Sequence, residues 1–462
     1  MTLAGAPRAA RPARRSPHEL TFTLDEALVE RFAADEPAWL AADRRAALER
    51  YRALPIETNP LYTTYLDLRT ADLADVAAWP APAGAVTDGA AALPEGAAGF
   101  VELVEDGVAA VGLDDAARDA GVILDTLGGL IDRDPELARR VLADAGSLPA
   151  DDKLAQMTRA GWNQGVVLHV PAGVHLDRPV VIRWRAGEAG RALLTRTILD
   201  LGKDAAASVV EEHEPSDGAE GRTGAQALFT GTLEVHLAAG ADLSIASIQD
   251  LATGTVAFQH RQAEIGEGAS LRWALAQLGG RLVRSRVDNR LVGNRSTVEQ
   301  VEIVFGADDQ LFDLTSYTRH IGRDTTGNLL SKAALLDATR SYMKGLIVIE
   351  PTAVGTDSFL GEFGMNLSKQ ARAVAIPSLE IDQPDCRRAA HSSSVGPIDE
   401  TQLFYLESRG IDPDEARKFI VLGFLEPVVA RVPLESARED LRELLEAKWD
   451  AGAGGAGAAS AA

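Results

Sequence analysis

The sequence contains one cysteine, Cys386, among its 462 residues. A single thiol cannot close a disulfide within the chain, and such sparing use of cysteine fits a reducing compartment. We therefore expect a cytoplasmic protein. Aromatic residues make up only 5% of the chain, whereas Ala and Gly are abundant. That balance favours many short strands and tight turns over a few thick cores.

Long apolar runs and clustered positive charge are also missing. No run approaches the roughly 18 residues needed to span a membrane, and no apolar segment follows the N-terminal arginines, so we expect neither a membrane anchor nor a secretory signal. The net charge is −22, which works against nucleic-acid binding because phosphate contacts need clustered Lys and Arg.

Three nucleotide-binding and hydrolase motifs are absent as well. The chain has no GxxxxGK[ST] loop, no GxGxxG at a strand-to-helix turn and no GxSxG elbow. Because these motifs hold phosphates or a nucleophilic serine, the chain is not expected to hydrolyse ATP itself.

What the sequence does contain, from about Trp162 onwards, is a long series of short strands separated by glycine turns. Residues 166–184 predict a strand, a Pro-Ala-Gly turn and a second strand. Gly240, Gly266 and Gly293 mark units that recur every 26 or 27 residues, with no helical pattern between them. A single coil cannot bury its apolar face alone, but stacked coils can. The pattern predicts a parallel β-helix; a β-sandwich or jelly roll is the alternative.

Helical periodicity precedes and follows this series. Apolar residues recur at helical spacing between Leu24 and Leu54, and again beyond Ile398. The predicted organisation is a disordered tail (1–23), an N-terminal helical region (24–150), a β-helix core (160–390), a C-terminal helical region (391–449) and a flexible tail (450–462).

Two kinds of side chain could carry chemistry. Cys386 and His391 are five residues apart, and their sulfur and imidazole ligands suit Fe, Zn, Cu(I) or an iron–sulfur centre. The pair could equally be a nucleophile and its base, or a buried thiol and a loop histidine bonded to the backbone. Acids along the strands could instead serve a β-helix polysaccharide lyase or hydrolase; they are Glu211, Glu212, Glu264, Asp308, Asp309 and Asp313.

Several motifs resemble the SufB/SufD family, the core proteins of the SUF iron–sulfur cluster assembly system. The most specific are Ile376–Ile381 (IPSLEI), His391–Gly396 (HSSSVG) and Ile398–Leu406 (IDETQLFYL). Ser408–Ile411 (SRGI) continues the last of these motifs, and weaker likenesses lie in the segments Asn366–Ser368, Val170–Val174 and Pro37–Leu40. Many family members place a cysteine where Ala389 stands, and Gly-Ala-Thr where this chain has Ser392-Ser393-Ser394.

The resemblance implies a right-handed parallel β-helix between two helical regions. It implies a non-catalytic scaffold that pairs with a SufB-like subunit through the β-helices and docks the SufC ATPase, which turns over ATP, on its C-terminal helices. One cysteine and the N-terminal helices favour a SufD-like chain over a SufB-type scaffold. A homodimer remains open.

The resemblance also implies a site. His391 occupies the place of the histidine that would share a transient Fe–S cluster with a partner subunit, with Cys386 as a weaker candidate ligand; no cluster is expected to stay bound to the chain alone. The helix after Asp412 has more apolar residues than one stripe needs. The surplus is either intramolecular core or the SufC docking face, and it consists of Phe419, Ile420, Phe424 and Leu425.

Overall fold

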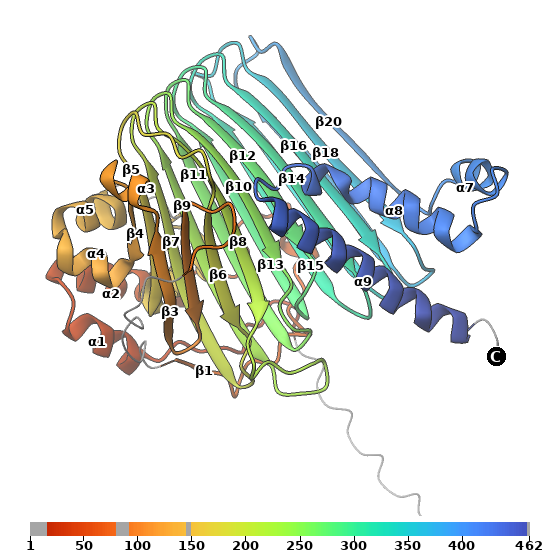
Figure 1. The fold of residues 1–462 in the computed structure, drawn as a ribbon, viewed down its shortest axis with the longest axis horizontal. Coiled ribbons are helices and arrows are strands. Elements are labelled where there is room, and N and C mark those ends of the chain that lie inside the picture. The colour runs from red at the N-terminus through yellow and green to blue at the C-terminus, as the bar shows by residue number, and fades with distance from the viewer. Residues whose placement is uncertain (1–15, 80–91, 145–148, 460–462) are drawn as a thin grey trace, which may run out of the picture.

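The computed structural model describes residues 16–79, 92–144 and 149–459. Its centre is a parallel β-solenoid, with helices packed near both ends of the chain (Figure 1). Strands that follow one another in sequence lie in opposite sheets, and each pairs in parallel with the strand two further on. The predicted mainly β fold is therefore confirmed, and the alternative of a β-sandwich is wrong.

Each coil contributes one strand to each of two sheets. Sheet A contains β5 (Gln164–Val170), β7 (Arg191–Leu201), β9 (Ala227–Leu237), β11 (Thr255–Ile265), β13 (Leu282–Leu291), β15 (Leu311–His320), β17 (Arg340–Ile349) and β19 (Arg372–Ile381). Sheet B contains β6 (Val180–Ala186), β8 (Ala206–Pro215), β10 (Asp242–Gln249), β12 (Ser270–Gln277), β14 (Thr297–Gly306), β16 (Thr326–Leu335), β18 (Asp357–Asn366) and β20 (Arg388–Gly396).

One corner of the solenoid contains the residues that mark the repeat. Glycine is needed at Gly266 and Gly293 because an added Cβ would collide with the backbone of the preceding coil, at Leu237 and Glu267. Gly240 (φ +71°) and Asp324 (φ +55°) have left-handed backbones, a conformation open to Gly and tolerated by Asp. Each donates its N–H to the next coil, Gly240 to the carbonyl of Glu267 and Asp324 to that of Val354, both at 2.8 Å. The corner therefore links successive coils; its left-handed residues are Asp204, Gly240, Gly268, Arg295, Asp324 and Gly355.

The N-terminal region covers the first coils and the outer face of sheet A (Figure 1). Its helices are α1 (Glu26–Ala34), α2 (Ala38–Ala53), η1 (Thr63–Tyr65), α3 (Asp115–Asp119), α4 (Leu127–Arg133), α5 (Pro135–Arg139), η2 (Arg140–Asp144) and α6 (Lys153–Gly161). The region also contributes strands: β1 (Ala77–Ala78), β2 (Gly99–Val104), β3 (Gly107–Leu113) and β4 (Ile123–Thr126).

Those strands correct the expectation of a wholly helical region over 24–150. β2 and β3 form an antiparallel hairpin that extends sheet B, closed by the two-residue turn Glu105-Asp106. The expected tail 1–23 is also too long. Pro17 accepts a hydrogen bond from the Leu68 N–H and Phe22 is buried, so residues 16–23 pack against the body; residues 1–15 lie outside the described part.

Three helices follow the solenoid: α7 (Glu400–Glu407), α8 (Pro413–Val429) and α9 (Glu435–Ala459). Helices α8 and α9 cross the outer face of sheet B, whereas α7 stands away from it (Figure 1). The boundary expected at residue 390 is wrong, because residues 388–396 pair with β18 and form one more strand. The tail expected over 450–462 begins too early, because α9 continues to Ala459; its many alanines favour helix.

Candidate functional site

The last coil, formed by β19 and β20 and called here the terminal coil, is not covered by another coil. Both strands stand at the free edge of their sheets (Figure 1). Positions that are buried in earlier coils are half-buried or exposed in these two strands. The end of the solenoid is therefore an open surface with two unpaired strand edges.

His391 lies on β20, opposite Leu360 of β18, and Ser393 lies opposite Glu362. Leu360 and Glu362 are 0% and 1% exposed, and Leu360 packs in the lumen between the sheets. Residues opposite each other in a ladder point to the same face. His391 and Ser393 thus belong to the lumen-facing row of the terminal coil and are exposed because that coil is uncovered.

Cys386 lies in the turn between β19 and β20, inside the solenoid. The thiol is free and half-buried, and it packs with Leu379 and Ala389 against the apolar cluster around Leu360. In the described ranges, no three His, Cys, Asp or Glu side chains come together closely enough to hold a metal ion. Neither Cys386 nor His391 has a complete ligand set within this chain.

Glu362, which sequence reasoning missed, stands directly beneath this row. Burial raises the pKa of Glu362 to about 8. The Ile376 N–H donates a hydrogen bond of 2.8 Å to its Oε2 atom, which lowers the pKa but offsets only part of this rise. The acid is therefore largely neutral at physiological pH, a state typical of functional sites. A charged residue two positions after Leu360, on the same face of β18, was the available signal.

A groove of about 840 Å³ separates the ends of β18 and β20 from helices α7 and α8. The expected docking residues Phe419, Ile420 and Phe424 line it, together with Phe363 and Tyr405. The Phe419 side chain is 69% exposed. Phe419 also borders a second groove, of about 420 Å³, between α8 and α9.

Leu425, the fourth expected docking residue, faces the other way. Its side chain is 0% exposed and packs in the apolar cluster between α8, α9 and sheet B. It therefore holds α8 on the solenoid. The surplus of apolar residues on α8 is explained in part by this intramolecular core and in part by the groove.

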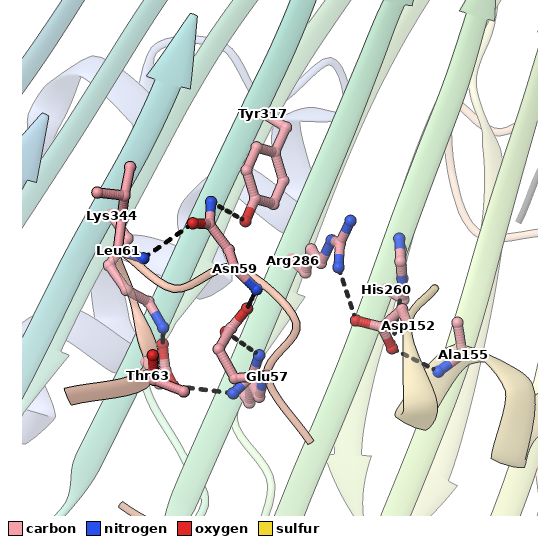
Figure 2. A network of polar contacts seen from close by, with 12 residues as sticks. Glu57, Asn59, Leu61, Thr63, Asp152, Ala155, His260, Arg286, Tyr317 and Lys344 are labelled. Atoms are coloured by element: carbon pink, nitrogen blue, oxygen red, sulfur yellow. Dashed lines mark hydrogen bonds and ion pairs between the residues drawn. The ribbon is translucent and has the colours of Figure 1, made fainter. Parts of the chain in front are cut away.

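A second polar cluster lies between the N-terminal region and the outer face of sheet A (Figure 2). Arg284 of β13 forms an ion pair with Glu57, and Lys344 of β17 forms one with Asp313, at 2.7 and 2.5 Å. Asn59 donates to the Tyr317 hydroxyl. These contacts fasten residues 57–63 across β13, β15 and β17.

Asp152 fastens α6 to the same sheet (Figure 2). Its carboxylate caps the helix by accepting the Ala155 N–H and pairs with Arg286 at 2.9 Å. Although burial alone would lower the pKa of His260, the carboxylates of Asp152 and Asp288 raise it above the ordinary value. The alternation Arg284, Arg286, Asp288 along β13 was the sequence signal for this covered polar face. Every one of these groups has a partner of opposite charge, so the cluster is structural.

The architecture is that of a parallel β-solenoid protein whose last coil is uncovered and whose C-terminal helices border an apolar groove. A family model described as SUF system FeS cluster assembly, SufBD core domain, matches residues 184–424. This match spans more than half of the chain, which therefore belongs to the SufBD family of iron–sulfur cluster assembly proteins.

Individual relatives agree with this assignment. The iron–sulfur cluster assembly protein SufD of Bacillus subtilis is 26% identical over 444 residues, covering 92% of this chain and 98% of the relative. A SufBD family protein of Mycobacterium tuberculosis is 30% identical over 311 residues, covering 65% and 75% of the two chains, and one of Mycobacterium leprae is 28% identical over 309 residues, covering 65% and 76%. Among the described helices, none has the length and apolarity needed to cross a bilayer.

Proposed function

We propose that this chain is a non-catalytic, SufD-like scaffold subunit of a cytoplasmic SUF complex. In this proposal it pairs with a SufB-like subunit through the open end of the solenoid and binds a SufC-type ATPase on α7 and α8. Family membership supports the assembly function over the β-helix lyase alternative. The uncovered terminal coil is the main observation in support of the proposal, because another chain can pair with its unpaired strand edges.

His391 is the proposed contribution of this chain to cluster assembly. It lies on the lumen-facing row of the terminal coil, where a partner that covers this coil would approach it. The remaining ligands would come from that partner, so the cluster is a transient product and not a resident cofactor. Cys386, which packs among apolar side chains, has the weaker claim to a ligand role.

The proposed ATPase site is the groove lined by Phe419, Ile420 and Phe424. Exposed aromatic side chains around an apolar groove are typical of binding surfaces. Phe404 and Tyr405 of α7, 70% and 56% exposed, continue the same apolar area.

The test uses the complex of this chain with its two partners. Replacing His391 with Ala should slow cluster formation from iron and sulfide by about tenfold or more, a typical loss for a metal-site residue, while the complex still assembles. His18→Ala, an exposed histidine at the N-terminal end, is the control and should have no effect. Cluster formation at the normal rate with His391→Ala would show that the histidine assignment is wrong.

Two further variants separate the proposed surfaces. Val395→Arg at the open end should abolish pairing with the SufB-like subunit and leave ATPase binding intact, whereas Phe419→Ala should do the reverse. The native mass of each mixture shows which partners have bound. It also shows whether a second copy of this chain takes the place of the SufB-like subunit.

A further inference from the structure

Residues 57–65, called here the strap, cross the outer face of sheet A one strand after another (Figure 2). Glu57 pairs with Arg284 of β13 at 2.7 Å, and Asn59 donates to the Tyr317 hydroxyl of β15 at 3.2 Å. Strands β13, β15, β17 and β19 are consecutive neighbours in the sheet. The order of these contacts therefore leads along the solenoid towards its open end.

Tyr62 continues the strap over the next strands. Its side chain is fully buried, and its ring centroid lies 6.1 Å from that of Tyr317 and 5.6 Å from the Lys344 Nζ atom of β17. Tyr65 packs against Tyr342 of β17, with ring centroids 6.0 Å apart. The strap thus holds β17 through two aromatic side chains and one buried cation.

The contact surface of Tyr62 also reaches the terminal coil. The Tyr62 hydroxyl faces Ser378 of β19. Ile376, which lies on the same face of β19 as Ser378, is opposite Lys344 in the ladder with β17. Tyr62 therefore covers the outer face of β17 and β19 together, and it joins the N-terminal region to the open end.

Strand β19 depends on such a contact more than an inner strand does. Within the described ranges, β13 has a ladder on both edges, whereas β19 pairs with β17 alone. Contacts on the outer face therefore supply a larger share of what holds β19 in place. Because segments with few contacts open locally at a low free-energy cost, β19 would fluctuate without the strap.

We propose that Tyr62 is a positioning residue for the pairing surface: through β17 and Ser378 it holds the terminal coil in the shape that the SufB-like subunit binds. This inference rests on the proposed function, which assigns pairing to the open end. The Tyr62 side chain is 0% exposed, so it acts on pairing through β19 and not by touching the partner.

The experiment measures amide hydrogen exchange in the full chain and the affinity of that chain for the SufB-like subunit. Tyr62→Ala should raise the exchange rates of β19 and β20 by about tenfold or more and weaken pairing by a similar factor, while β7 and β9 exchange as in the wild type. Tyr62→Phe keeps the ring contacts with Tyr317 and Lys344 and should behave as the wild type in both measurements.

Tyr51→Ala is the matched control. It removes another buried tyrosine of the N-terminal region, which is 6% exposed and lies in α2. Exchange of β19 and pairing should both stay unchanged in this variant.

Three results would overturn the inference. These are wild-type exchange of β19 in Tyr62→Ala, normal pairing in Tyr62→Ala although β19 exchanges faster, and faster exchange in every strand, which would mark Tyr62 as a general core residue. Val395→Arg tests the proposed function separately, because it places a charge on the pairing surface itself. If Val395→Arg abolishes pairing and Tyr62→Ala does not, only the inference is wrong, whereas normal pairing in both variants overturns the inference together with the proposed function.

Discussion

Arg284 of β13 and Glu57 of the N-terminal region form an ion pair 2.7 Å long in which the side chains are 3% and 2% exposed. The pair joins residues 227 positions apart in sequence. It shows that the N-terminal region is attached to the solenoid by buried charges as well as by apolar packing.

Removing one member of this pair should destabilise the chain strongly. Glu57→Gln leaves the Arg284 charge buried with Asp313 alone, at 3.4 Å, and should cost about 3 kcal/mol in the free energy of unfolding. The control is Glu267→Gln, which breaks an exposed ion pair with Arg295 of the same 2.7 Å length and should cost less than about 1 kcal/mol. Urea denaturation of both variants gives the comparison; equal costs would contradict the structural role of the buried cluster.

The attachment of α6 should weaken as the pH rises. The pKa of His260 is raised in the folded state by Asp152 of α6 and Asp288 of β13, although burial opposes this, and Arg286 also faces the two carboxylates. The stabilisation that His260 supplies is therefore complete below its unfolded pKa of about 6.5 and is lost as the pH rises through the folded-state pKa. The difference in unfolding free energy between wild type and His260→Gln should be largest near pH 6 and shrink towards pH 9. A difference that does not change with pH would show that His260 remains neutral.

Glu362→Gln should stabilise the protein. Burial raises the pKa of Glu362 to about 8 in the folded state, whereas its pKa in the unfolded chain is near 4.5. The free energy of unfolding therefore falls as the pH rises above about 4.5, and it stops falling above about pH 8. The gain should be on the order of 4 kcal/mol at pH 8 and close to zero at pH 4. Thermal unfolding at the two pH values measures it. A variant less stable than the wild type at pH 8 would show that the carboxyl group has a partner in solution.

Two apolar residues of α8 should behave oppositely. Leu425→Ala removes a fully buried side chain and should cost about 2–5 kcal/mol. Phe419→Ala removes an exposed one, so unfolding should be little changed while binding of the ATPase weakens. Denaturation combined with a pull-down distinguishes them; a large stability loss in Phe419→Ala would place that ring in the core.

The sequence predicted the solenoid because its repeat depends on local chemistry. The left-handed corner near Gly240 favours Gly or Asp, which fill every one of its left-handed positions except Arg295, and such residues are visible in the sequence. The repeated strands and the helices at both ends were found in the same way, whereas the motif at His391 was found through the family resemblance. The family resemblance was confirmed by comparison with known proteins.

The parts that were missed depend on contacts between distant residues. Strand β20 contains Ser392, Ser393 and Ser394, which suggest a turn, and only its ladder with β18 makes it a strand. The burial of Glu362 follows from the coil that closes over it, and the roles of Arg284 and Asp152 follow from segments far away in sequence. The alternation along β13 and the acid at Glu362 mark polar positions in the sequence, but neither identifies the distant residues that contact them.

The uncovered terminal coil also has a consequence for the cell that makes this chain. A free strand edge can recruit any exposed strand and start aggregation, and Pro377 on β19 removes only one of the donors that such a strand would use. In the proposed complex a partner covers this edge, and copies made in excess of that partner would present the edge to each other and to unfolded proteins. Balanced synthesis of the subunits, or rapid removal of orphan copies, is therefore a requirement that the shape of the molecule imposes.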